Sequence, residues 1–553
     1  MTTPISCSNP AKPSCQRQKF KKKWLTALTL LVQATIIFVV FCSLLFNPAL
    51  AQTAAGATEA SVSGPGLPLL GDGSDMASNA ERRLGDRIAR ELYHDPDYID
   101  DPVLWDYVQG VWQPLLVAAR QRGDLTAELD ERFAWKILLG RDRTVNAFAL
   151  PGGYLGLNLG LLAVVSSRDE LASVLGHELS HVTQRHISRL VSKNNQQAPW
   201  MIGAMILGAL AASKNAEAGK TLMVGGQALA AQSQLNFSRD MEREADRLGF
   251  GVMTQAGFEP IGFVTMFDKL QQASRLNDNG AYPYLRSHPL TTERIADMHS
   301  RLTLAAPRAI DKTPTALHAM MVARARVLSN PGVDALRGWQ AQVDDLMLLT
   351  LPRAAQIGTL YGAAMAASRL RDTPLAQRHQ QRLMTLVAPD APMLQQVRWL
   401  GMEIGLAATD LPVGPSAAAQ PVADEPLRRP ALMLQAQMAL KSGAPAALDK
   451  SAQNLQIWLA QQPQDALAWQ WLSGVYGAQN QSLRALRAQA EVQVAQLDYA
   501  AALDRLKAAQ DRVREGAGVG MGVGSSAAHI DASIIDTRRR QIEVLLREQT
   551  LDR

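Results

Sequence analysis

The chain has 553 residues, and 47% of them are hydrophobic, which suits more than one packed domain and excludes a wholly disordered protein. The formal net charge of +5 comes from residues 1–51, which hold six basic side chains and no acidic one. The remainder has 50 basic and 51 acidic residues and therefore gives no electrostatic reason to expect nucleic-acid binding. All three cysteines, Cys7, Cys15 and Cys42, lie in that first segment, so the rest of the chain can form neither a disulfide nor a thiolate metal site.

The N-terminal segment predicts export from the cytoplasm. A basic stretch that ends at Lys23 precedes the uncharged, mostly apolar run Leu25–Phe46, and Ala49-Leu-Ala51 fits a signal-peptidase site. The apolar run is also long enough to span a bilayer as a helix, so residues 1–51 are either a cleaved signal peptide or a signal anchor. In both cases the positive charge before the run predicts that the rest of the chain faces the periplasm. Residues 52–77, rich in Gly, Ala, Ser and Pro, are predicted to be a linker.

Residues 78–304 are predicted to form one α+β domain. In chain order its first elements are helices at 81–93 and 102–123, a strand at 133–139 and a β-hairpin formed by 144–149 and 154–159. The hairpin strand that holds Asn146, Ala147 and Phe148 could pair with an extended substrate by strand addition. The alternative is that this hairpin serves only as part of the core.

The next helix carries the sequence His177-Glu178-Leu-Ser-His181. Ser167 and Glu170 form a capping box, which predicts where this helix begins. Residues four apart lie on one face of an α-helix, so the two imidazoles can bind one Zn²⁺ and leave Glu178 beside the open coordination position.

A second helix is predicted to supply the third ligand. The stretch Ser238–Asp246 places Glu242 and Asp246 four residues apart, and a carboxylate on a facing helix completes a His₂Glu site with one position left for water. Asp246 is expected to accept the spare ring N–H of a ligating histidine. Glu244 is expected to point elsewhere, because it lies roughly 200° round the helix from Glu242.

These motifs resemble those of the family-48 zinc metallopeptidases, which include prenyl-protein endoproteases and a bacterial heat-shock membrane protease. Besides the HExxH and SRxxExxAD patterns, the resemblance rests on Asn146-Ala-Phe-Ala-Leu-Pro-Gly-Gly153 and on His288-Pro-Leu-Thr-Thr-Glu-Arg294. It is strong over about residues 80–302 and looser beyond them.

The resemblance implies a zincin-like fold and a role for each motif residue. It implies that zinc is bound by His177, His181 and Glu242. Glu178 would be the catalytic base, and Asp246 would have a catalytic role, often described as that of a proton donor. The residues alone indicate instead that Asp246 orients a ligand.

Two further histidines have open interpretations. His288 precedes Pro289 and is either a pocket residue or a loop residue. As a pocket residue it would bind transition-state oxygen or the fourth zinc position; as a loop residue it would orient Arg294 or cap a helix. His186 lies roughly 140° from His181 round a regular helix, so it is expected to be structural and not a ligand.

The apolar stretch 199–231 lies between the two motifs that supply the ligands. Each of its halves is too short to span a bilayer. It is interpreted as a buried helical pair or a mobile flap over the cleft. A third interpretation is a membrane-surface hairpin, which would give a peripheral membrane contact.

Beyond residue 304 the chain is predicted to be helical. Its parts are a helical repeat segment at 305–409, a linker at 410–429, and tetratricopeptide-like repeats at 430–553 with a Gly-rich spacer at 516–526. The offsets of a tetratricopeptide repeat are kept by Trp469, Leu472, Tyr476 and Ala485. Such arrays form concave surfaces that bind other proteins, and the alternative is that the array only buttresses the protease.

The sequence therefore predicts a predominantly α protein in which a zincin-like α+β metallopeptidase domain precedes an α-helical tetratricopeptide-like repeat domain. The predicted function is that of a periplasmic zinc endopeptidase with one Zn²⁺ per chain. The resemblance implies unfolded or misassembled outer-membrane proteins as substrates, with the repeats docking on outer-membrane assembly machinery. The alternative is a periplasmic chaperone or scaffold with a mainly structural metal site, which would need four protein ligands and no adjacent glutamate.

Overall fold

The computed structural model describes residues 76–193, 238–275, 281–304, 315–343, 345–388, 390–408, 428–518 and 526–551. The predicted signal segment, most of both linkers, the apolar stretch 199–231 and most of the Gly-rich spacer lie outside the described residues. None of the helices within the described ranges combines the length and the apolar composition that a membrane crossing requires.

The first part of the chain contains a three-stranded sheet. Its strands are β1 (Lys136–Gly140), β2 (Ala147–Leu150) and β3 (Tyr154–Asn158), in the order β1-β3-β2. Strand β1 pairs with β3 in parallel, and β2 pairs with β3 antiparallel across the turn Pro151–Gly153. Gly152 and Gly153 have φ values of 70° and 85°, which glycine adopts without a steric penalty. The predicted β-hairpin is thus present, and β2 is its outer strand.

The predicted strand at 133–139 begins later than expected. A short helix, α4 (Ala127–Arg132), is capped by the Thr126 side chain and ends at Phe133. Trp135 then has a φ of 49°, so the chain turns before it enters the sheet at Lys136. The apolar side chain of Phe133 is buried in the core, which explains why the pattern resembled a longer strand.

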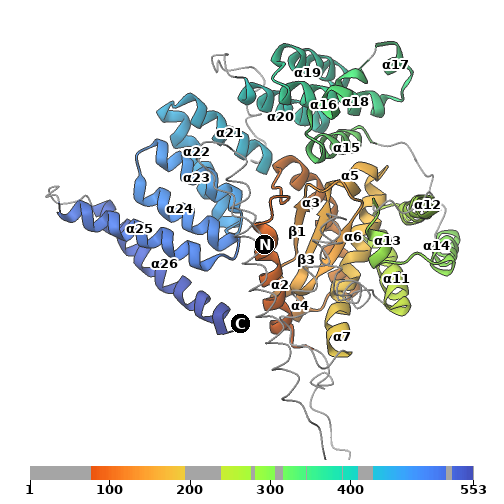
Figure 1. Ribbon diagram of the computed structural model, residues 1–553, viewed down its shortest axis with the longest axis horizontal. Coiled ribbons are helices and arrows are strands. Elements are labelled where there is room, and N and C mark those ends of the chain that lie inside the picture. Colours follow the sequence, from red (N-terminus) through yellow and green to blue (C-terminus); the bar gives the residue numbers. More distant parts are fainter. Residues whose placement is uncertain are drawn as a thin grey trace, which may run out of the picture. The chain divides into compact units, whose positions relative to one another are not determined.

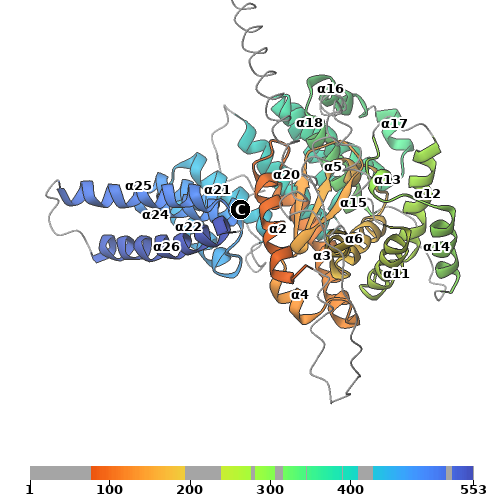
Figure 2. The same ribbon diagram turned by 60° about the horizontal axis from the view of Figure 1, so that its bottom comes forward.

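Helices surround this sheet in the first half of the chain. They are α2 (Ser78–Tyr93), α3 (Pro102–Arg122), α5 (Leu159–Val164), α6 (Arg168–Thr183), α7 (His186–Lys193), α11 (Arg239–Gln255), α12 (Ile261–Arg275), α13 (Tyr284–Ser287) and α14 (Thr292–Leu304). Helix α6 lies between the sheet and α11 in both views (Figures 1 and 2), and it also packs on α3 and α12.

Helix α6 is the central element of this part of the chain. The Ser167 side chain caps it by accepting the N–H of Glu170, while the Glu170 carboxylate accepts the N–H of Ser166. The predicted capping box is therefore half formed. All side chains from Glu170 to Thr183 are buried, as expected of a helix packed on every side.

The rest of the described chain is helical, as predicted. Its helices are α15 (Ala316–Ser329), α16 (Val333–Ala341), α17 (Asp345–Thr350), α18 (Arg353–Arg369), α19 (Thr373–Val387), α20 (Ala391–Ala407), α21 (Arg429–Ser442), α22 (Pro445–Gln461), α23 (Ala466–Ala478), α24 (Ser482–Ala495), α25 (Tyr499–Gly518) and α26 (Ser526–Leu551). Neighbours along the chain pack on each other, first within the green group α15–α20 and then within the blue group α21–α26 (Figure 1).

Two buried arginines join these helices to the start of α3. Arg324 of α15 donates two hydrogen bonds to Asp101, at 2.8 and 2.6 Å. Arg429 of α21 donates two to Asp100, at 2.7 and 2.8 Å, and two more to Asp465, the N-cap of α23. Two adjacent aspartates of the first half therefore each bind an arginine from a different helical group.

Candidate metal centre and active site

Four buried side chains meet between α6, α11 and the end of α13: His177, His181, Glu242 and His288. One ligand atom from each lies within 4.8 Å of all the others. The two α6 histidines place their Nε2 atoms 3.0 Å apart, and His177 Nε2 lies 3.3 Å from His288 Nδ1. Glu242 Oε1 lies 3.0 Å from His288 Nδ1 and 3.5 Å from His181 Nε2.

These distances fit one tetrahedral metal ion. A Zn²⁺ with bonds of about 2.0–2.1 Å would separate its ligand atoms by roughly 3.3 Å, which lies within the observed spacings. Imidazole nitrogens with a carboxylate oxygen are also a donor set that suits zinc. The structure thus brings together the three predicted ligands and adds His288 as a fourth candidate.

The electrostatics of the cluster favour a cation. Burial lowers the pKa of His177, but its hydrogen bonds to Asp246 and Glu242 outweigh burial and raise this pKa to about 10. Burial raises the pKa of Glu242, but His288 and His177 hold it well below its usual range, so this carboxylate stays ionised. A divalent cation would supply the positive charge that these groups favour while leaving the imidazoles neutral.

The crossing of α6 and α11 places the ligands at this distance from one another. Glu242, Asp246 and Gly249 follow one another at spacings of four and three, so they share one face of α11. At the crossing, a Cβ on Gly249 would lie 2.9 Å from the carbonyl carbon of Gly176 and 2.9 Å from the backbone nitrogen of His177. Only glycine allows the two backbones to come this close.

Asp246 has the geometry expected of a residue that orients a ligand. Its Oδ1 lies 2.9 Å from Nδ1 of His177, so the spare ring N–H of His177 can donate to it and Nε2 keeps its lone pair for a metal. Arg294 donates two hydrogen bonds to Asp246, at 2.6 and 2.8 Å, and lies 2.8 Å from Glu242. Arg294 therefore holds the carboxylates of both Glu242 and Asp246 in place.

Glu178 lies beside the ligand cluster without belonging to it. Its Oε2 accepts the backbone N–H of Ala149 at 2.9 Å, and its Oε1 lies 3.4 Å from Nε2 of His288. Complete burial raises the pKa of Glu178, although His288, His177 and a hydrogen bond with Tyr284 oppose this. A carboxylate with a raised pKa is better suited to take and return a proton near neutral pH.

Two contacts of Glu178 could not be found by sequence reasoning. The Ala149 contact is made by the backbone, which carries no side-chain signal. Tyr284 lies far along the chain, and burial raises the pKa of its hydroxyl well above the usual value, so it stays protonated as a donor. Its ring also packs against that of His288, with the ring centroids 4.7 Å apart.

The predicted substrate strand lies at the outer side of the sheet. The backbone oxygen of Asn146 accepts the N–H of Asn158, so these two residues form a hydrogen-bonded pair. Along an antiparallel ladder, every second residue of β2 then bonds to β3, and the residues between them face away from β3. The backbone N–H and C=O of Phe148 therefore face β3, while those of Ala147 and Ala149 face the outer edge. Of Asn146, Ala147 and Phe148, only Ala147 presents its backbone to that edge, and Ala149 joins it.

His186 lies beside His181, a position that it could not reach if α6 continued as a regular helix. Helix α6 ends at Thr183, Arg185 has a φ of 52°, and α7 begins at His186. This turn directs His186 back toward the site, with its Nδ1 2.8 Å from Nδ1 of His181. As predicted, His186 is not among the four clustered ligand candidates, but it contacts one of them.

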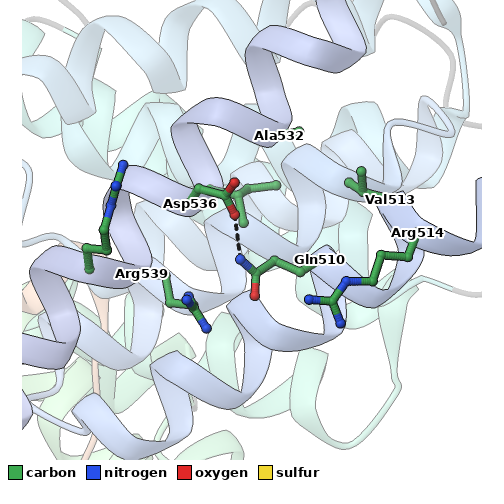
Figure 3. A pocket seen from close by; sticks show the side chains of 8 residues that line it. Gln510, Val513, Arg514, Ala532, Asp536 and Arg539 are labelled. Carbon is green, nitrogen blue, oxygen red and sulfur yellow. Dashed lines mark hydrogen bonds between the residues drawn. The ribbon is translucent and has the colours of Figure 1, made fainter. Parts of the chain in front are cut away.

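A groove of about 340 Å³ lies between α25 and α26 (Figure 3). It is lined by Gln510, Val513, Arg514, Ala532, Ile535, Asp536, Arg539 and Arg540, and the Gln510 amide donates to Asp536. These residues include one carboxylate and no histidine. The groove is therefore a polar surface feature of the last two helices and not a second metal centre.

Comparison with known proteins identifies relatives of the part that holds the site. Residues 123–302 match the sequence profile described as peptidase family M48. A putative beta-barrel assembly-enhancing protease of Vibrio cholerae is 33% identical over 298 residues, which cover 53% of this chain and 58% of that protein. The beta-barrel assembly-enhancing protease of Escherichia coli is 27% identical over 466 residues, or 81% of this chain and 88% of that protein. The mitochondrial metalloendopeptidase OMA1 of Arabidopsis thaliana is 31% identical over 164 residues, or 30% of this chain and 31% of that protein.

Proposed function

Because residues 123–302 belong to peptidase family M48, we propose that this metallopeptidase is a zinc-dependent endopeptidase that cleaves misassembled outer-membrane proteins in the periplasm. The observation that carries the proposal is the buried cluster of His177, His181 and Glu242 with Glu178 directly beside it. The chain matches only 58% of the length of the Vibrio cholerae relative, so substrates and partners are part of the proposal.

Each residue around the cluster has a separate role in the proposed reaction. His177, His181 and Glu242 would hold the zinc, which would supply Lewis-acid activation of water and of the scissile carbonyl. Glu178 takes a proton from the attacking water and passes it to the leaving amine. The Ala149 N–H holds the Glu178 carboxylate in position, and the Tyr284 hydroxyl remains available as a neutral donor beside it.

The outer edge of β2 is the place for the substrate backbone in this proposal. Ala147 turns its N–H and C=O to that edge, whereas Ala149 offers only its C=O there because its N–H is bonded to Glu178. An extended peptide paired along β2 would therefore run beside Glu178. Backbone pairing satisfies the polar groups of any extended chain, which suits a protease whose substrates are unfolded proteins.

The site is closed to solvent in the described structure. Glu178 is completely buried, and His288 is 2% exposed. The segment before His288 lies along the chain that enters β2, because Val145 donates to the Ala281 carbonyl and accepts from Tyr284. We propose that the segment from Ala281 to Ser287 moves away from Val145 when a substrate enters. We also propose that His288 occupies the fourth ligand position when no substrate is bound.

The helices after α14 are proposed to bind the assembly machinery of outer-membrane proteins. Two relatives are named beta-barrel assembly-enhancing proteases, and the Escherichia coli match extends well past the peptidase residues. The arginine-lined groove between α25 and α26 gives these helices a charged surface for a protein partner (Figure 3). Periplasmic location is proposed because of the basic and apolar sequence of residues 1–51.

One observation favours a second candidate function. With His288 the cluster has four protein groups, which is the number that a structural zinc site uses. The chain would then be a scaffold or chaperone whose metal only stabilises the fold. Glu178 argues against this, since a structural site has no use for a buried carboxylate at its edge.

A comparison of the wild type with Glu178→Gln tests the proposal. The substitution is nearly isosteric and removes no ligand, so zinc content by elemental analysis should not change. Cleavage of an unfolded outer-membrane β-barrel protein should fall by about 10² or more, the scale of lost general-base catalysis. The exposed Glu293→Gln on α14 serves as the matched control and should cleave normally. Undiminished turnover by Glu178→Gln would refute the role of the base, and a wild type without zinc would refute the metal site.

A further inference from the structure

A chain of contacts leads from the second metal-ligand histidine to the protein surface. Nδ1 of His181 lies 2.8 Å from Nδ1 of His186, and Nε2 of His186 lies 3.1 Å from Oε2 of Glu244. Arg189 holds the same carboxylate oxygen at 3.1 Å. His186 is fully buried, whereas the Glu244 side chain is 30% exposed.

The donors and acceptors in this chain allow one consistent arrangement for a metal ligand. A carboxylate only accepts, so Nε2 of His186 carries the proton that is shared with Glu244. A neutral imidazole has one N–H, which leaves Nδ1 of His186 as an acceptor. Nδ1 of His181 must then be the donor, and Nε2 of His181, which faces the ligand cluster, keeps its lone pair.

Without this chain, His181 could take the other tautomer. A proton on its Nε2 would face the metal position and would have to be displaced before an ion could bind. His177 has the corresponding protection from Asp246, at 2.9 Å from its Nδ1. The two histidines of the HExxH motif thus have different orienting partners. Asp246 orients His177, whereas His186, which contacts Glu244, orients His181.

We propose that His186 and Glu244 are positioning residues that fix the tautomer and ring orientation of His181 for metal binding. The inference rests on the proposed metal site and adds to it two residues that do not touch the ion. The turn at Arg185 makes the arrangement possible. A φ of 52° is uncommon for a residue other than glycine, and the Arg185 side chain is anchored to Glu81 and to the Met76 carbonyl.

Zinc affinity, measured by competition with a chromophoric chelator, tests this role without relying on catalysis. His186→Ala keeps all the ligands and should still bind zinc at saturation. Its affinity should fall by about 10- to 100-fold, the usual cost of losing such a partner. His186→Asn places an amide oxygen where Nδ1 was, and this oxygen can still accept the N–H of His181, so the variant should recover much of the affinity. The visible spectrum of the Co²⁺-loaded protein should change in the alanine variant and return toward that of the wild type in the asparagine variant.

Glu244→Ala provides a second route to the same answer. Its side chain is partly exposed, so the variant should fold, and its zinc affinity should fall in the same direction by a smaller factor. The double variant His186→Ala with Glu244→Ala should bind zinc no more weakly than His186→Ala alone, because Glu244 acts through His186. Arg243→Ala, an exposed neighbour on α11, is the matched control and should bind zinc like the wild type.

The outcomes separate this inference from the proposed function. A wild type that binds no zinc would remove the metal site itself. If the wild type binds zinc and His186→Ala binds it equally tightly, only the positioning role is overturned. Equal losses in the alanine and asparagine variants would also overturn it, since they would show that the imidazole acts only by filling space.

Discussion

At the scale of single residues, the roles of the buried carboxylates follow from what each one touches. Glu242 faces three imidazoles and is held ionised, as a metal ligand must be. Asp246 contacts His177 and pairs with Arg294, and these contacts favour an orienting role over a ligand role. Glu178 is bound by the Ala149 N–H, and burial raises its pKa toward the range of a proton carrier.

Removal of a ligand should remove the metal. His177→Ala and Glu242→Ala each take away one of the three predicted ligands and leave only two of them beside His288, so the zinc content measured by elemental analysis should fall. The exposed His299→Ala on α14 should retain a full complement. Normal zinc content in both ligand variants would contradict the assigned site.

Loss of His288 should activate the enzyme. Its Nδ1 lies 3.3 Å from His177 Nε2 and 3.0 Å from Glu242 Oε1, where it would occupy the position that the catalytic water needs. His288→Ala should therefore raise basal peptide cleavage while zinc content stays constant. A fall in cleavage by roughly 10²–10³ would instead assign His288 to the stabilisation of transition-state oxygen.

At the scale of elements, the site depends on how closely two helices cross. Helix α6 supplies His177, His181 and the proposed base Glu178, and α11 supplies the proposed third ligand Glu242. The backbones meet at Gly176 and Gly249, next to His177 in one helix and one turn past Asp246 in the other. A larger residue at this crossing would move Glu242 away from the histidines.

Gly249→Ala and Gly251→Ala should have opposite effects on stability. Both replace glycine by a better helix former, which by itself stabilises a helix by about 1 kcal/mol. At position 249 the new Cβ would lie 2.9 Å from the backbone of α6, and such overpacking typically costs ~1–3 kcal/mol. At position 251 it would meet only the flexible end of the Arg122 side chain.

Urea denaturation and chelator competition would measure both effects. The variant at position 249 should unfold at lower urea and bind zinc more weakly, whereas the variant at position 251 should match or exceed the stability of the wild type. Wild-type zinc affinity in Gly249→Ala would show that the crossing does not set the ligand distances.

At the scale of the whole described chain, the helices after α14 are attached to the first half through buried charges. Arg429 is 3% exposed, contacts two aspartates, and lies over the ring of Trp105 with 4.7 Å to the ring centroid. Arg428, its neighbour, is 44% exposed and pairs with Asp106 at the surface. These contacts favour helices that are firmly joined to the peptidase residues over helices on a loose tether.

Arg429→Ala should loosen this attachment. It would leave the largely covered carboxylates of Asp100 and Asp465, whose side chains are 20% and 7% exposed, without their guanidinium partner, and breaking a buried pair typically costs about 3–5 kcal/mol. The midpoint of urea denaturation should fall, and limited proteolysis should cut more rapidly between α20 and α21. Arg428→Ala is the matched control and should change stability by no more than about 1 kcal/mol, because its ion pair is exposed. Equal behaviour of the two variants would refute the attachment through Arg429.

The sequence by itself determined the helical class and the hairpin, and it named three of the four side chains that the structure brings together as candidate ligands. His177, His181 and Glu242 could be identified because spacings of four residues on a helix translate directly into a shared face. The hairpin followed from Pro151-Gly-Gly153, whose backbone preferences are local. The interpretations of residues 1–51, of residues 199–231 and of the repeat boundaries remain predictions.

Only the tertiary structure decided which groups meet from distant parts of the chain. His288 joins the cluster and Tyr284 reaches Glu178 across more than a hundred residues, and no periodicity records such contacts. The contact of His186 with His181 depends on the positive φ of Arg185. Arginine rarely adopts such a φ, so the sequence gives no signal for this turn. The spacing of residues along the sequence determines which side chains share a face of one helix or strand. Contacts between helices depend instead on how closely the helices pack. For α6 and α11, that distance depends on Gly176 and Gly249 at their crossing.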